Sequence, residues 1–126
     1  MTDHPASPPI RILLVEDSRN DAELILLQLK KDGLDADCKQ VKKEDEFIAA
    51  LAWPPDLILS DYSLPQFSGP RALEIIKEKN QDIPFILVSS AADEETIINA
   101  FKQGADDYLM KDRLGRLGPG YSKMPL

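Results

Sequence analysis

The stretch Leu57-Ile58-Leu59-Ser60, which ends at Asp61, decides the fold. A short and almost continuous apolar run is typical of a strand in a parallel sheet that is covered on both faces. Four further segments have strand character, and the last of them leads to Lys111: Ile10–Val15, Asp35–Val41, Phe85–Val88 (ending at Ser89) and Asp107–Met110. We therefore expect five strands.

Helices are predicted between these strands, at 19–31, 44–52, from about Pro70, and at 93–103. Gly33 and Gly104 lie just past two of them, where helices favour a glycine. Strands that alternate with helices imply right-handed crossovers, and hence an α/β fold with a doubly wound parallel sheet. After Lys111 the sequence DRLGRLGPGYSKMPL holds three glycines and two prolines, so the fifth helix is predicted to be short or missing.

Composition narrows the function classes. The 126 residues fit one domain, which we place at 10–117 between a flexible tail (1–9) and a C-terminal tail (118–126). The formal net charge of −7 argues against direct nucleic-acid binding. A single cysteine cannot form an internal disulfide, the apolar runs are too short to span a membrane, and no signal peptide is visible, so we expect a cytoplasmic protein.

Chemistry is expected at the carboxyl ends of the strands, because open parallel sheets bind ligands there. The residues at these ends are Glu16 and Asp17, then Asp61, Ser89 and Lys111. Carboxylates that share a site repel one another, and Mg²⁺, which prefers hard oxygen ligands, removes the repulsion. A hydroxyl and an ammonium group beside them suit a charged phosphoryl group.

Asp61 is the natural nucleophile of this set, because it lies at the end of the central strand. Any one of these residues alone is more often a turn residue, a helix cap or a surface charge. Their coincidence at one sheet edge is what favours a phosphoryl-transfer site.

Four segments together resemble the response-regulator receiver domain of two-component signalling: ILLVEDS (12–18), LILSDYSLPQFSG (57–69), IPFILVSSA (83–91) and GADDYLMK (104–111). The resemblance covers about residues 10–117. It implies a flavodoxin-like sheet of strand order 2-1-3-4-5. It also implies phosphorylation by a sensor histidine kinase or a histidine phosphotransfer protein, and an effect on a downstream output protein or domain.

The resemblance assigns the metal site first. Asp61 accepts the phosphoryl group. Asp17 ligates Mg²⁺ directly, Glu16 does so through water, and the backbone carbonyl of Ser63 completes the protein ligands.

The resemblance also assigns the switch. Lys111 pairs with the phosphoryl oxygens, Ser89 moves to bond them, and Tyr108 is the aromatic residue that follows inward. Ser90 is small where access to the site is needed. The family usually has Lys-Pro with a cis peptide after the last strand, whereas this chain has Lys111-Asp112.

The first predicted helix suggests a docking surface. Helical spacing places Ala22, Ile25, Leu26 and Leu29 on one face and directs Leu24 and Leu27 away from it. With Ser18, Leu24 and Leu27 are candidates for docking a partner helix. Burial of both leucines by the sheet and a neighbouring helix is the alternative.

Two other functions compete with the signalling switch. The first is a metal-dependent phosphohydrolase of the haloacid-dehalogenase type, which has a second acid two residues after its nucleophile. This chain has Ser63 there and no length for a cap domain, so we expect no turnover of an external substrate. The second is a receiver-fold binding module that works without phosphorylation. The chain is expected to be a monomer or a weak dimer.

Overall fold

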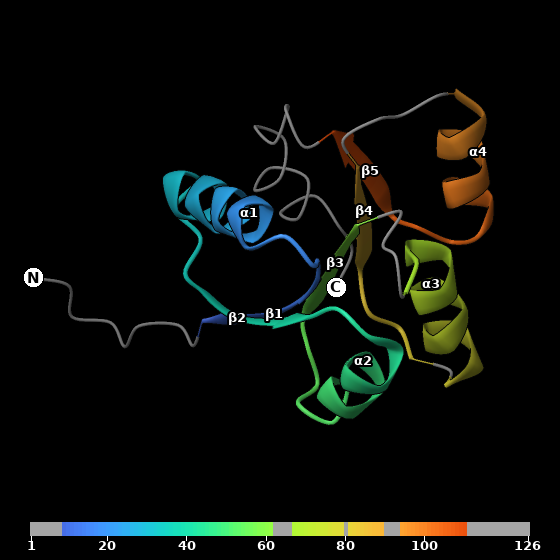
Figure 1. Cartoon of the computed structure of the whole chain (residues 1–126), viewed down its shortest axis with the longest axis horizontal. Coiled ribbons are helices and arrows are strands. Elements are labelled where there is room, and N and C mark those ends of the chain that lie inside the picture. The colour runs from blue at the N-terminus through green and yellow to red at the C-terminus, as the bar shows by residue number, and fades with distance from the viewer. Residues whose placement is uncertain (1–8, 62–66, 80, 90–93, 111–126) are drawn as a thin grey trace, which may run out of the picture.

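The computed structural model describes residues 9–61, 67–79, 81–89 and 94–110. These residues form five strands that alternate with four helices, as Figure 1 shows. In chain order they are β1 (Ile10–Val15), α1 (Arg19–Lys31), β2 (Ala36–Val41), α2 (Glu44–Ala50), β3 (Leu57–Asp61), α3 (Gly69–Glu78), β4 (Phe85–Ser89), α4 (Glu94–Lys102) and β5 (Asp107–Met110).

The strands form one parallel sheet in the order β2-β1-β3-β4-β5, which confirms the predicted fold class. The predicted helix 44–52 is wrong at its end, because α2 stops at Ala50. Leu51 and Ala52 continue only as turns, and Pro54 and Pro55 prevent further helix. Gly33 and Gly104 have φ angles of 80° and 108°, as expected for residues that end a helix.

Helix α1 covers one face of the sheet (Figure 1). Its residues Ala22, Ile25 and Leu29 are buried against the side chains of β1, β3, β4 and β5 that point to this face. The prediction that Leu26 belongs to the same buried face is wrong, since 37% of Leu26 is exposed. The apolar stripe of α1 is therefore narrower than the helical spacing suggested.

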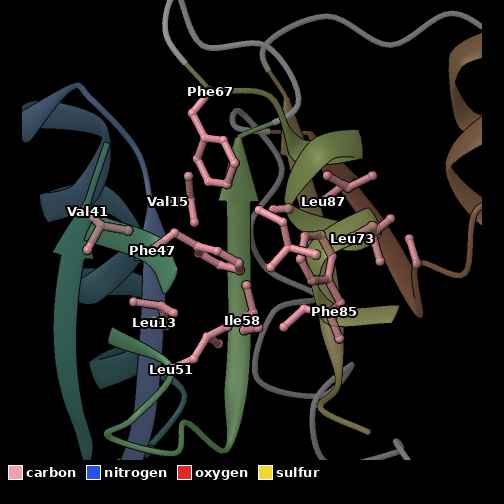
Figure 2. Close-up of a cluster of buried hydrophobic side chains, with 14 of the residues drawn as sticks. Leu13, Val15, Val41, Phe47, Leu51, Ile58, Phe67, Leu73, Phe85 and Leu87 are labelled. Atoms are coloured by element: carbon pink, nitrogen blue, oxygen red, sulfur yellow. The ribbon is translucent and has the colours of Figure 1, made fainter. Parts of the chain in front are cut away.

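Helices α2, α3 and α4 contribute to the cluster on the opposite face. Figure 2 shows Phe47 of α2 and Phe67 as neighbours beside β3, and their ring centroids are 5.3 Å apart. Phe67 lies close to the carboxyl end of β3, so this apolar cluster reaches the edge where Asp61 ends the strand. The burial of large side chains on both faces fixes the central strands and hence the positions of the residues at their ends.

Helices α2 and α3 are also joined by charge. The Arg71 guanidinium donates from Nε to Glu44 Oε1 at 3.0 Å and also pairs with Glu74. These hydrogen bonds raise the pKa of Arg71 above its ordinary value. None of the helices in the described part of the chain is long and apolar enough to cross a membrane.

Candidate functional site

The register of the sheet places three of the predicted site residues at neighbouring strand ends. Ser60 is opposite Val15, so Asp61 lies next to the segment that follows β1. Asp61 in turn is opposite Val88 of β4, and Ser89 follows directly. The carboxyl ends of β1, β3 and β4 therefore bring Glu16, Asp61 and Ser89 to one edge, as the sequence predicted. Asp61 is partly exposed there, and a ligand can reach it from solvent.

The two acids after β1 differ in their surroundings. Glu16 is only 1% exposed, and its Oε2 accepts a hydrogen bond from the Ser18 backbone N–H at 3.1 Å. The Ser18 hydroxyl oxygen accepts from the Asp21 N–H at 3.2 Å and caps α1. Asp17 is exposed. Glu16 thus shapes the loop, while the carboxylate of Asp17 remains open to a ligand from solvent.

The hydroxyl and aromatic candidates are buried. Ser89 ends β4, and Tyr108 of β5 belongs to the apolar cluster that also contains Phe85 and Leu87. Tyr108 is therefore in an inward position in this structure.

Sequence reasoning missed Ser60, whose hydroxyl donates to the carbonyl of Asp61 at 3.1 Å. A hydroxyl residue directly before the acid was the available signal.

A pocket of about 340 Å³ lies beside the two acids, between the ends of β1 and β2. Its lining residues are Glu16, Asp17, Arg19, Gln40, Val41, Lys42 and Glu46. The contribution of β2 to this edge was missed. A signal existed, because the polar residues Gln40 and Lys42 flank Val41 at the end of β2, and β2 is the neighbour of β1 in the expected strand order.

The comparison with known families agrees with this geometry. The family model of the response regulator receiver domain matches residues 12–117. The chain belongs to this family. Receiver domains are signalling domains of two-component systems, so a role in signalling follows for this chain at the level of the family.

One curated relative of this receiver domain is the phosphate regulon transcriptional regulatory protein PhoB of Escherichia coli. It is 33% identical over 104 residues, which are 80% of this chain and 44% of PhoB. The chain therefore spans less than half the length of such relatives.

Two solved structures are similar to this receiver domain throughout. The Mn²⁺-bound form of the response regulator Rcp1 is 27% identical, with a TM-score of 0.74 over 94% of this chain and 99% of that one. The phosphorylated cyanobacterial phytochrome response regulator RcpA is 25% identical, with a TM-score of 0.75 over 92% and 93% of the two chains.

The donor atoms of the receiver domain fit a hard divalent cation. Among the residues that the structure describes, no three His, Cys, Asp or Glu side chains form a ready-made metal cage. Mg²⁺ does not need one, because it usually keeps several waters and takes one or two carboxylates. Asp17 and Asp61 supply two carboxylates from adjacent strand ends. The predicted ligand Ser63 lies outside the described residues, as do Ser90 and Lys111 with the peptide that follows it.

The remaining candidates are placed as follows. Leu24 and Leu27 of α1 are exposed by 54% and 52%, so the alternative in which the fold buries them is wrong.

Cys38 is half-buried, and burial together with the Asp37 carboxylate raises the pKa of its thiol to about 11. The thiol is therefore protonated at neutral pH and is no candidate nucleophile.

Proposed function

We propose that Asp61 accepts a phosphoryl group from a phosphohistidine of a sensor histidine kinase or a histidine phosphotransfer protein. The observation that carries this proposal is the position of Asp61. It is a partly exposed carboxylate at the end of a buried central strand, between the acids after β1 and Ser89 of β4. A rigid strand holds the nucleophile, and polar groups flank it on both sides.

The transfer is a substitution at phosphorus. A carboxylate oxygen of Asp61 forms the new O–P bond while the N–P bond of the donor breaks. The electron pair of that bond stays on the imidazole nitrogen, which then takes up a proton from solvent. The product is an acyl phosphate on Asp61, and no other reactant is needed. On this proposal the chain promotes only its own phosphorylation and dephosphorylation and turns over no external substrate.

Mg²⁺ is the cofactor that the proposal requires. Asp17 and Asp61 would hold it directly, Glu16 through water, and the carbonyl of Ser63 would be a further ligand. The cation would supply positive charge that offsets the negative charge on the transferred phosphoryl oxygens. The burial of Glu16 and its bond to Ser18 fix the loop that presents Asp17, which is the contribution of the chain itself.

Phosphorylation would then change the surface that partners read. The acyl phosphate carries about −1.5 to −2 charges where the carboxylate carried one, and it presents three phosphoryl acceptor oxygens. Ser89 is the residue after Val88, which is opposite Asp61, so Ser89 lies close to the new charge. Lys111 would pair with the phosphoryl oxygens. Ser90 would leave access to the site because it is small. Tyr108 packs in the cluster beside β4 and would adjust with Ser89. Such a shift between two arrangements alters binding to an output protein or domain.

The remaining expectations belong to the same proposal. Ser18, Leu24 and Leu27 would lie in the contact with the phosphodonor protein, because α1 begins next to the acids and exposes both leucines. The chain itself would act in the cytoplasm as a monomer or weak dimer. Its net charge of −7 disfavours direct contact with nucleic acid, and any such contact by a full-length protein would use other residues.

Acetyl phosphate with Mg²⁺, followed by intact mass measurement, tests the proposal. We expect one phosphoryl adduct on the wild-type chain and none on Asp61→Asn. The matched control is Asp56→Asn, because Asp56 lies at the other end of the same strand and its side chain accepts the Arg11 N–H at 2.9 Å, a bond that asparagine keeps. An adduct that persists in Asp61→Asn would show that the acceptor is a different residue.

The same mass measurement, together with an assay of phosphate release from an external phosphate ester, separates the two other functions. A binding module that works without phosphorylation predicts no adduct with any donor. A phosphohydrolase predicts continued release of phosphate from an external phosphate ester. We expect neither result, because the edge of the sheet combines a nucleophile with cation ligands but the sequence places no second acid two residues after Asp61.

A further inference from the structure

The hydrogen-bond ladder between β1 and β2 is completed by a side chain at its carboxyl end. The ladder runs from the Ile10 N–H, which donates to the Asp35 carbonyl at 2.9 Å, to the Glu16 N–H, which donates to the Val41 carbonyl at 3.0 Å. In a regular parallel ladder the next bond would run from the Lys43 N–H to the Glu16 carbonyl. That bond does not form, because the chain turns from β2 into α2 at this point.

The Lys43 N–H donates to the side chain of Glu46 instead. Its Oε1 accepts from the Lys43 N–H at 3.1 Å and from the Lys42 N–H at 3.0 Å, which starts α2. The Glu16 carbonyl accepts instead from the side chain of Gln40, whose Nε2 lies 2.7 Å away. The side chain of Gln40 therefore donates the hydrogen bond to the Glu16 carbonyl that the Lys43 N–H would donate in a regular ladder.

We propose that Gln40 is a positioning residue for the cation-binding acids. The Glu16 carbonyl belongs to the peptide unit that leads into Asp17, so the bond from Gln40 fixes the orientation of that unit. With the Glu16 N–H held by Val41, both sides of Glu16 are tied to β2. To share a cation with Asp61, the exposed side chain of Asp17 has to point toward the end of β3. Gln40 restrains the peptide unit that sets the direction of this side chain. Gln40 and Asp17 line the same pocket.

This inference rests on the proposed function, since it concerns the acids that would hold Mg²⁺. Groups that orient metal ligands without touching the metal typically change affinity by about 10–100-fold when they are removed. Gln40 orients a ligand through the backbone, so we expect the lower end of that range. The substitution Gln40→Met keeps the length of the side chain and removes its N–H donor.

The test is a calorimetric titration of Mg²⁺ into the metal-free chain, which measures the Kd for Mg²⁺. Gln40→Met should raise the Kd for Mg²⁺ about tenfold. Gln28→Met is the matched control, because Gln28 also donates one side-chain bond, at 3.1 Å to Asp32, near the far end of α1. It should leave the Kd unchanged. Gln40→Ala, which also lacks the donor, should repeat the result of Gln40→Met.

Two further measurements separate positioning from a loss of structure. Hydrogen exchange of the amides of residues 16–18 in the metal-free chain should become faster in Gln40→Met and stay unchanged in Gln28→Met. With acetyl phosphate, the Mg²⁺ concentration for half-maximal phosphorylation should rise by the same factor as the Kd. The rate at saturating Mg²⁺ should not change, because the bound cation then orders the loop.

Each remaining outcome would overturn the inference. If Gln40→Met and Gln40→Ala bind Mg²⁺ as the wild type does, Gln40 positions nothing, while phosphorylation of the wild type would leave the proposed function intact. If both variants unfold, Gln40 is a determinant of the fold. If the wild type neither binds Mg²⁺ nor accepts a phosphoryl group, the proposed function fails as well.

Discussion

Acids lie at both edges of the sheet, and the two edges use them in opposite ways. At the amino edge, Asp56 and Asp106 each precede a strand. The Asp56 N–H donates to the Arg11 carbonyl at 2.7 Å, and its carboxylate accepts the Arg11 N–H at 2.9 Å. Asp106 exchanges the same pair of bonds with Phe85, both at 2.8 Å. These two aspartates extend the parallel ladder by one rung and serve stability.

At the carboxyl edge the acids differ from one another in their exposure to solvent. Asp17 is exposed, and Asp61 is partly exposed at the end of β3. Glu16 is buried, and its carboxylate accepts a hydrogen bond from the Ser18 backbone N–H. The difference teaches that the residue type alone does not decide the role. Asp56 and Asp106, which precede strands, complete hydrogen bonds of the ladder, whereas Asp17 and Asp61, which lie at the carboxyl ends of strands, are exposed or partly exposed to solvent.

The largest expected effect concerns the carboxyl edge. Asp17→Asn removes one charge from the pair of carboxylates that would hold Mg²⁺, and we expect the Kd for Mg²⁺ to rise at least about tenfold. The free energy of unfolding of the metal-free chain should change by less than about 0.5 kcal/mol, because the side chain is exposed. Calorimetric titration and urea unfolding measure the two quantities. A large loss of stability with unchanged affinity would reverse the assignment of roles.

The next effect concerns the amino edge. Asp106→Ala leaves the N–H of Phe85, a buried residue, without its acceptor, so the free energy of unfolding should fall by about 1–3 kcal/mol. Asp56→Ala should cost less, because the Arg11 N–H that it frees is exposed and can bond to water. Urea unfolding ranks the two variants. Phosphorylation by acetyl phosphate should proceed normally in both, and a loss of the adduct would show that this edge is not purely structural.

The sequence predicted the parts of the molecule that depend on local pattern. Apolar runs located the strands, and the position of Asp61 after one of them located the candidate site. Leu26 was misplaced because helical spacing does not tell how wide a stripe the sheet covers. Gln40 was missed for a different reason. Its bond to the Glu16 carbonyl depends on the register of β1 and β2 and on the hydrogen bond from the Lys43 N–H to Glu46. No pattern along the chain contains that information.

The smallest expected effect concerns docking next to the carboxyl edge. Leu27→Lys places a charge on an exposed face of α1, where 52% of the leucine is accessible, and we expect phosphotransfer from a histidine kinase that phosphorylates the wild type to slow by about threefold. Ile48→Lys is the matched control, since Ile48 is 38% exposed on α2, across the sheet from α1. Both variants should unfold at the urea concentration of the wild type and accept the phosphoryl group from acetyl phosphate at its rate. If the two lysines slow the kinase equally, the effect is one of net charge and α1 is not the docking face. If only Leu27→Lys slows it, the phosphodonor protein reaches Asp61 over the face that carries this leucine.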